Sequence, residues 1–295
     1  VFSQNHVEVI FWEEKISFRK ICEIQNGTKE NRRGVLSMIL LYHHVKPEVD
    51  DEISISLEKF TKHMLGLQDK TVVYLEDYNP SDANQVVITF DDGYKSVLTY
   101  AAPILKHFGY PFELFLVKDF YDKAQQGDEF FLNEDDLKNL MKIGGRLQYH
   151  TKSHPHLEEI SDYKKLEEEI VAPDYMKNLD KSGFEWFAYP FCTYNDMVID
   201  VVKKYYKGAR TGKWLDGGTI YTLGSVFVKD DTILSEELSF DEQACDLCTK
   251  LFHSKKIKEF FKYFFYKLMF FVSFGEKKEY FRAKYKEAKK RTETY

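Results

Sequence analysis

Short apolar runs that alternate with helical patterns constrain this 295-residue chain more than any other feature. After residue 34, runs rich in Val, Ile, Phe and Tyr are separated by segments with the periodicity of helices. Such alternation is typical of βα units, in which helices cover a largely parallel sheet. The expected strands are 38–45, 71–75, 86–90, 112–117, 147–150, 186–190, a short run near Ala209, and 226–228. The expected helices are 57–67, 94–108, 134–143, 162–181 and 196–207.

These elements predict an α/β fold, a distorted (β/α)7-type barrel of largely parallel strands with an added C-terminal helical segment. An open doubly wound sheet is the alternative. Residues 1–34 end in a polar stretch and read as an N-terminal extension. Residues 35–232 would form the barrel domain, and residues 233–295 a helical extension that is basic and aromatic.

The net charge of −6 conceals an uneven distribution of charge. Residues 255–295 contain 13 Lys and Arg against 5 Asp and Glu, so the rest of the chain is strongly acidic. An acidic fold is poorly suited to gripping nucleic acid phosphates, and we expect no nucleic acid partner. We interpret the basic, aromatic segment 255–295 as helices packed on the barrel. The alternative is a helix that binds a membrane surface.

The sequence contains little that indicates where in the cell the protein is located. No apolar run approaches the roughly 20 residues that a membrane span needs. The chain starts at Val1, and residues 1–10 lack the pattern of a signal peptide. We expect a bacterial cell envelope or periplasmic location if an export signal is missing from this sequence, and otherwise a cytoplasmic or membrane-peripheral one.

Cys245 and Cys248 have the spacing of half a zinc ribbon. No second pair of cysteines or histidines accompanies them, as a ribbon would require. We interpret them as two cysteines on one face of a helix.

Two adjacent carboxylates, Asp91 and Asp92, follow the apolar run 86–90 and precede Gly93. In barrels of βα units, catalytic groups gather at the C-terminal ends of strands. Two acids at such an edge repel each other and lose solvation, so a nearby cation would help to keep them ionised. The competing interpretation is that one of them caps the helix that starts near Tyr94.

Two histidines, His150 and His154, follow another apolar run at residues 147–150. Imidazoles four residues apart can converge on one metal ion if the segment turns helically. Together with Asp92 they would leave coordination positions open, as a hydrolytic metal site does. The competing interpretation is a pair of surface histidines beside Pro155.

Both segments resemble motifs of a known family. Thr89-Phe-Asp-Asp-Gly93 and His150-Thr-Lys-Ser-His154 are similar to the first two motifs of the polysaccharide deacetylase family, also called the NodB-homology domain or carbohydrate esterase family 4. The resemblance covers roughly residues 36–230. It implies that Asp91 is the catalytic base and that Asp92, His150 and His154 bind a divalent metal ion.

The third motif of the family, Arg-x-Pro-Tyr/Phe-Gly, resembles Ala188-Tyr-Pro-Phe-Cys192 here. The resemblance implies that the backbone N–H of Phe191 holds the oxyanion of the intermediate, with Tyr189 beside it at the substrate. The family's arginine, which steadies the base, is replaced by Ala188. Arg210, near the end of a later short strand, is our candidate to replace it.

The family's general acid is a histidine in a Leu-x-His segment at the end of a strand. One branch, which includes exopolysaccharide deacetylases of biofilm bacteria, carries this motif on the N-terminal side. Leu41-Tyr-His43 ends the first strand, so the resemblance implies that His43 is the acid. His253 is the alternative, and His44 is expected to be structural because neighbouring strand residues point in opposite directions.

The resemblance implies a metal-dependent hydrolase that removes N-acetyl groups from amino sugars of a polysaccharide or cell-envelope glycan. Imidazole and carboxylate ligands suit zinc, and nickel, cobalt or iron would also fit. Two alternatives stay open. One is a catalytically inactive glycan-binding protein on the same fold, and the other is a deacylase or deformylase of a lipid-linked amino sugar. The sequence does not indicate an oligomeric state.

Overall fold

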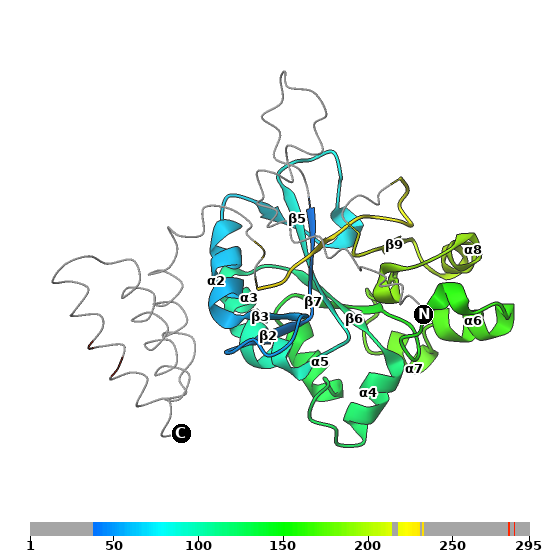
Figure 1. Cartoon of the computed structure of the whole chain (residues 1–295), viewed down its shortest axis with the longest axis horizontal. Helices are drawn as coiled ribbons and strands as arrows, with labels where there is room; N and C mark the ends of the chain where they lie inside the picture. Colours follow the sequence, from blue (N-terminus) through cyan, green and yellow to red (C-terminus); the bar gives the residue numbers. More distant parts are fainter. Residues whose placement is uncertain (1–37, 214–217, 231, 233–282, 284–285, 287–295) are drawn as a thin grey trace, which may run out of the picture.

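The computed structural model describes residues 38–213, 218–230, 232, 283 and 286 (Figure 1). The N-terminal extension predicted over residues 1–34 lies outside the described residues. So does all of the predicted C-terminal extension apart from two positions, and with it His253 and the Cys245–Cys248 pair. Within the described part of the chain, no helix is long and apolar enough to cross a membrane.

One curled, parallel sheet forms the centre of the protein. Its strands lie in the order β10, β1, β5, β6, β7, β8, β9, with β4 added beside β5, and all of these pairings are parallel. Leu223 bridges to Arg210 of β9, and Val226 then pairs with Leu40 of β1. One short segment therefore borders both edges of the sheet, which confirms the predicted distorted barrel. The strands are β1 (Met38–Tyr42), β4 (Thr71–Val72), β5 (Gln85–Asp91), β6 (Phe112–Leu116), β7 (Gly145–Tyr149), β8 (Trp186–Ala188), β9 (Gly208–Arg210) and β10 (Val226–Phe227).

Helices surround the sheet on its outer side (Figure 1). They are α2 (Leu57–Gly66), α3 (Ala102–Phe108), α4 (Lys118–Gln125), α5 (Glu134–Met141), α6 (Tyr163–Ile170), α7 (Asp174–Lys177) and α8 (Asp196–Tyr205). The shorter elements are β2 (His44–Lys46), β3 (Ser54–Ser56), η1 (Leu75–Asp77), the π-helical turn η2 (Val97–Ala101), η3 (Leu157–Glu159) and η4 (Pro190–Cys192).

The strands present different residues to the helices and to the barrel interior. On β6, Leu114 belongs to the large core cluster beneath the helices, whereas Phe115 belongs to a smaller cluster inside the barrel. Because successive strand residues point to opposite faces, this alternation assigns each position to one side. Asp91 is in register with Phe115, and Arg210 is in register with Ala188 of the inner cluster. Asp91 and Arg210 therefore both point into the barrel.

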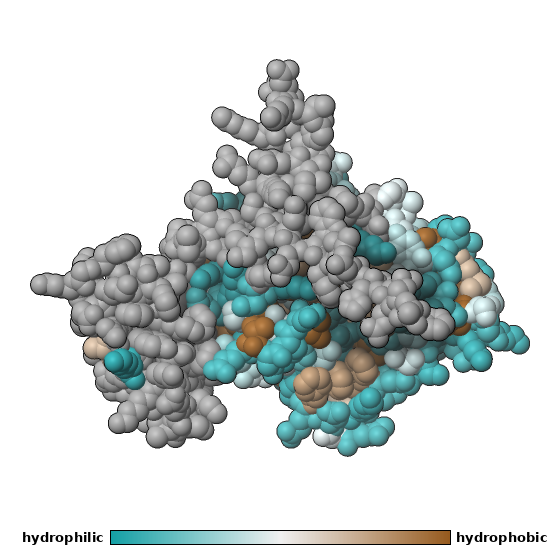
Figure 2. Space-filling model, viewed as in Figure 1, coloured by the Kyte–Doolittle hydropathy of each residue, from teal (hydrophilic) through white to brown (hydrophobic). Residues whose placement is uncertain are grey.

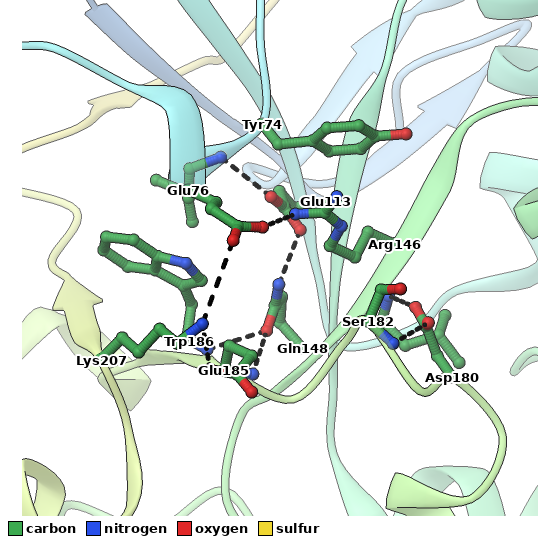
Figure 3. A network of polar contacts seen from close by, with 12 residues as sticks. Tyr74, Glu76, Glu113, Arg146, Gln148, Asp180, Ser182, Glu185, Trp186 and Lys207 are labelled. Atoms are coloured by element: carbon green, nitrogen blue, oxygen red, sulfur yellow. Dashed lines mark hydrogen bonds and ion pairs between the residues drawn. The ribbon is translucent and has the colours of Figure 1, made fainter.

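A buried polar network lies inside the barrel and joins three neighbouring strands (Figure 3). The Glu113 carboxylate accepts hydrogen bonds from the Leu75 N–H at 2.9 Å and from the Gln148 side-chain amide at 2.8 Å. The Gln148 side-chain oxygen in turn accepts from the backbone N–H groups of Glu185 and Trp186, each at 2.9 Å. Burial raises the pKa of Glu113 to about 7. The network ties β6, β7 and β8 together behind their C-terminal ends.

Two predicted helix starts are confirmed. The Asn133 side chain accepts from the Asp136 N–H, and the Asp136 carboxylate accepts from the Asn133 N–H, which forms a complete capping box. Asn195 caps α8 through the Val198 N–H at 3.0 Å.

Two predictions about single elements are wrong, and one helix was not predicted. The helix predicted over 162–181 is divided into α6 and α7, because Pro173 disfavours helical geometry in the residue before it. The strand predicted over 38–45 is interrupted at His43, so that β2 starts a separate pairing with β3. Helix α4 was not predicted, because a short segment with so many charged residues carries little periodic signal.

The polar network gives a test of what holds the strands together. Gln148→Ala should lower the free energy of unfolding by about 3 kcal/mol or more, since it leaves buried donors and an acceptor without partners. Gln85→Ala is the matched control, because the Gln85 side chain accepts one bond, from the exposed Asn79 N–H. Urea denaturation of both variants measures the difference, and equal, small losses would contradict a role for the network.

Candidate active site

The carboxylate pair lies at the C-terminal end of β5. Asp91 is the last residue of the strand, and Asp92 and Gly93 turn the chain away with positive φ angles of 68° and 76°. Both carboxylates are buried, with 3% and 6% of the residue exposed. The competing helix-capping interpretation is not supported: helical backbone starts at Lys95 and continues through η2 into α3, but among the described residues neither carboxylate accepts a hydrogen bond from a backbone N–H of this helix. The pair instead faces the interior of the rim.

Arg210 supplies the positive charge beside the base. Its guanidinium forms an ion pair with the Asp91 carboxylate and lies 4.4 Å from the centre of the Phe115 ring. Arg210 is 1% exposed. The structure therefore places an arginine against Asp91 from β9, although Ala188 on β8 stands where the family motif has its arginine.

His150 and His154 lie at the C-terminal end of β7, next to Asp92. The Nδ1 atom of His150 lies 2.7 Å from the Ala188 carbonyl. A carbonyl only accepts, so Nδ1 carries the hydrogen and Nε2 keeps a free lone pair. His154 has a positive φ of 62°, and its N–H donates to the Thr151 hydroxyl at 2.9 Å. This tight turn brings the second imidazole back over the first.

The three side chains fit a small divalent cation. The Nε2 atoms of the two histidines are 3.2 Å apart, and they lie 3.6 Å (His150) and 3.4 Å (His154) from Asp92 Oδ1. Ligands about 2.0–2.1 Å from a tetrahedral cation are themselves about 3.3 Å apart. The three spacings therefore match three corners of one tetrahedron.

The electrostatics of the cluster also favour a cation. Asp92 Oδ1 is buried and has no hydrogen-bond partner in the described part of the chain. Burial, followed by the charge of Asp91, raises the pKa of Asp92 to about 7. Burial also lowers the pKa of both histidines, so their imidazoles are neutral and their lone pairs are free to bind metal. A cation would relieve the unpaired buried oxygen.

His43 directly follows the end of β1 at the same rim, and His44 begins β2. His43 Nδ1 is buried without a hydrogen-bond partner in the described residues, and its ring lies 5.1 Å from that of Phe227. Burial lowers the pKa of His43 to about 4, and the nearby charge of Asp91 opposes this shift. His44 instead bonds to the Ser96 hydroxyl at 3.1 Å and stacks on Tyr94. The two histidines thus have different surroundings, as predicted.

Phe191 lies beside the metal cluster, whereas Tyr189 lies in the hydrophobic core. The Phe191 backbone has a φ of 54°, and no hydrogen bond joins its N–H to another described residue. Its ring is half exposed and contacts His154 edge to face at 4.7 Å. The Tyr189 ring is instead buried in the core, and its hydroxyl donates to the Tyr221 carbonyl. The structure therefore does not support contact between the Tyr189 side chain and a substrate.

Cys192, in place of the family's glycine, is accommodated by a second glycine. Cys192 adopts the positive φ of 59° that a glycine would favour. Its Sγ atom occupies the space beside Gly212, where a Cβ atom would come within 2.2 Å of it. The loop keeps its shape because position 212 has no side chain.

Glu158, which the sequence did not single out, connects the two loops of the site. Its carboxylate accepts from the Thr193 hydroxyl at 2.5 Å and lies 3.4 Å from His156 Nδ1. Its backbone carbonyl accepts from the Asn195 side chain at 3.3 Å. The loop that carries His154 is thereby fixed to the loop that carries Phe191.

Comparison with known proteins relates both the sequence and the fold to deacetylases. Residues 78–207 match the sequence model of the polysaccharide deacetylase family. The putative polysaccharide deacetylase YxkH of Bacillus subtilis (strain 168) is 24% identical over 176 residues, which are 56% of this chain and 60% of that protein. The chain thus matches less than two thirds of this relative's length.

Solved structures share the fold. The Streptococcus pyogenes deacetylase PplD, solved in complex with acetate, has a TM-score of 0.61 and 19% identity, over 70% of this chain and 98% of that one. IcaB from Ammonifex degensii has a TM-score of 0.56 and 20% identity, over 72% of this chain and 97% of that one.

The fold is thus a parallel α/β barrel like that of solved deacetylases. Residues 78–207 are similar in sequence to the polysaccharide deacetylase family. His43 and Arg210 lie outside the matched residues 78–207, so the structure alone places them at the site.

The metal cluster gives a direct prediction. Asp92→Asn and His150→Ala should each lower the metal content of the purified protein at least tenfold, because each removes one of three ligands. Asp91→Asn is the matched control and should keep its metal, since Asp91 lies outside the cluster. Elemental analysis after dialysis checks this, and a full metal load in Asp92→Asn would contradict the assignment.

Arg210 gives a second prediction. Arg210→Ala leaves a buried carboxylate unpaired and should cost about 3–5 kcal/mol of stability. Arg210→Lys keeps the charge and should retain most of the stability. Lys138→Ala is the control, because Lys138 pairs at 2.6 Å with Glu134 while both side chains are exposed, and its loss should change the free energy of unfolding little. Equal losses for Arg210→Ala and Lys138→Ala in urea denaturation would contradict the buried pair.

Proposed function

We propose that this protein is a metal-dependent hydrolase that removes N-acetyl groups from amino sugars of a glycan. The observation that carries the proposal is the convergence of Asp92, His150 and His154 at spacings that suit one cation, with Asp91 adjacent. A divalent cation held there, for which zinc is our choice, would lower the pKa of a water molecule and polarise the acyl carbonyl.

Asp91 is the proposed general base. It lies at the same strand end as the ligand Asp92, and its Oδ2 atom is 3.7 Å from His150 Nε2. A water molecule beside the cluster is therefore within reach of the Asp91 carboxylate, which accepts its proton during attack on the carbonyl. The ion pair with Arg210 orients the carboxylate and leaves its second oxygen for the water.

His43 is the proposed general acid. The leaving group is an amine, which needs a proton before the carbon–nitrogen bond breaks easily. A buried imidazolium with a low pKa is a strong acid, and the proton that Asp91 takes from water can recharge the ring. The proton of the attacking water thus ends on the amine, and the products are acetate and a free amino sugar.

The backbone N–H of Phe191 is the proposed oxyanion donor. It has no acceptor in the described residues and sits in the loop that borders His154. A fixed donor without a partner is suited to stabilising charge that develops in the transition state. The connection through Glu158 keeps this amide and the metal ligands in one arrangement.

An inactive glycan-binding protein is the competing proposal, and the altered positions Ala188 and Cys192 of the third motif favour it. The ion pair between Arg210 and Asp91 counts against it, because Asp91 has an arginine partner from another strand. A deacylase of a lipid-linked amino sugar rested on residues 255–295, of which only Ala283 and Lys286 are described, so contact with a membrane stays a prediction. A glycan substrate favours a cell-envelope location.

Acetate release tests the proposed function. The wild-type protein should release acetate from N-acetylglucosamine oligomers, and a chelator should abolish this until a divalent metal is restored. Asp91→Asn should keep its metal and lose activity by about 100-fold or more, as expected for a lost general base. Binding of oligomers without any acetate release at full metal load would instead favour the inactive glycan-binding protein.

The choice of acid has its own test. His43→Ala should lower kcat by about 100-fold while the metal content stays unchanged. His253→Ala, which removes the alternative acid, should keep near-normal kcat. Steady-state rates of acetate release check both variants, and the reverse result would transfer the role to His253.

A further inference from the structure

Helix α2 has no solvent-exposed face, although it lies on the outer side of the barrel beside α3 (Figure 1). None of its ten residues is exposed, since six are buried and four are half-buried. Each of the other described α-helices has at least one exposed residue. Most of the described surface drawn in Figure 2 is hydrophilic, as expected of helices that border solvent. The outer side of α2 is therefore covered.

An ion pair lies on the covered side of α2. Lys62 pairs with Glu58 at 2.7 Å, and the two side chains are 12% and 16% exposed. The pair of the same spacing on α5, Lys138 with Glu134, has side chains that are 51% and 43% exposed. Charged side chains on an outer helix normally reach water. The low exposure of the α2 pair therefore means that other atoms lie over it.

Leu65 indicates that the cover is partly apolar. It is 6% exposed, yet it belongs to none of the hydrophobic clusters that the described residues form. The core-facing residues of α2 include Leu57, Phe60 and Met64. Because a helix turns by about 100° per residue, Leu65 projects well to one side of them. Apolar side chains that pack on Leu65 from outside the core would account for its burial.

The chain itself reaches α2 where the main described part ends, at Thr232. The Asp230 carboxylate accepts a hydrogen bond at 2.8 Å from the N–H of Ser56, which is the N-cap of the helix. The Thr232 carbonyl lies 3.3 Å from Nε2 of His63, which belongs to the helix. Residues 233–295 therefore start directly against α2.

The sequence after Thr232 has the pattern of an amphipathic helix, with two adjacent rows of apolar residues at helical spacing. The rows are Leu234, Leu238, Cys245, Cys248 and Phe252, and Phe240, Ala244, Leu247 and Leu251. Residues 233–249 contain five Asp and Glu and no Lys or Arg. On a helix, Glu237 and Asp241 fall on the same side as the apolar rows, whereas Glu242 and Asp246 fall on the opposite side.

We propose that the outer face of α2 is the docking surface for residues 233–252 of the same chain, bound as an amphipathic helix. The apolar rows of this segment pack on Leu65 and on its surroundings. A helix of these residues would be roughly 30 Å long, against about 15 Å for α2, so it is long enough to cover the whole face. Cys245 and Cys248 then lie in the contact. The proposal does not depend on the reaction that the protein catalyses.

Charge complementarity favours this segment over the rest of the C-terminal extension. Lys59 and Lys62 give α2 a net positive charge, because Glu58 is its only acid. Residues 255–295 are strongly basic and would repel these lysines. The two acids on the apolar side of residues 233–252 can instead pair with them.

Zero-length cross-linking of the full-length wild-type protein tests which segment covers α2. A carbodiimide couples lysine amines to carboxylates that are in contact. The α2 peptide that contains Lys59 and Lys62 should be coupled to the 233–252 peptide in the monomer, with a yield that does not change with protein concentration. Lys138 on α5 is the internal control and should not be coupled to that peptide. The absence of the coupling would overturn the proposal, and so would a coupling found only in cross-linked dimers, which would assign the surface to a second copy.

Hydrogen exchange of matched variants tests the apolar contact. Leu251→Asp places a charge in an apolar row and should make the α2 amides exchange at least about tenfold faster, while the β6 amides keep their wild-type rates. Ser239→Asp adds the same charge on the opposite side of the expected helix and should leave α2 unchanged. Wild-type exchange of α2 in Leu251→Asp, or equal acceleration by both variants, would contradict docking through the apolar rows.

Discussion

The buried ion pair between Arg210 and Asp91 is the interaction on which the site depends. It joins β9 to β5 inside the barrel, and both partners are almost fully buried. Burying two charges costs several kcal/mol per ion, which their mutual attraction offsets only when the geometry is well fixed. The parallel sheet supplies that geometry, since β9 follows β8 in the register that places Arg210 beside Ala188. The same ion pair therefore links two strands across the barrel and fixes the position of the Asp91 carboxylate.

The same sheet explains why distant motifs converge. Strand β6 lies between β5 and β7 and pairs with both in parallel, so the ends of all three reach the same rim. Asp92 follows β5 and His150 follows β7, with β6 between these two strands, and their side chains point toward each other at the rim. Behind the rim, the hydrogen bond between Glu113 and Gln148 joins β6 to β7, the strand that carries His150. The chemistry is therefore supported by hydrogen bonds that lie well away from the reacting atoms.

Much of this arrangement could be predicted from the sequence, for a physical reason. Asp91, Asp92 and His150 directly follow apolar runs, and parallel strands bring such positions together. Arg210 was only a candidate, because its strand has three residues and no periodicity. Glu158 gave no signal, since a carboxylate in a short turn has no local pattern and its partner Thr193 is 35 positions away in the sequence. The single long helix predicted over 162–181 was wrong, because the prediction followed the apolar periodicity and did not take account of Pro173.

Left-handed backbone is concentrated at the rim. Outside glycine, six described residues have a positive φ, and five of them belong to the loops of the site: Asp92, Thr151, His154, Phe191 and Cys192. Each such residue costs on the order of 1 kcal/mol or more, which the surrounding fold must sustain. The backbone of the rim loops is thus strained, and the packed barrel beneath holds it in this conformation. A side chain larger than that of glycine at position 192 therefore needs free space beside it, and Gly212 supplies that space for the Cys192 thiol.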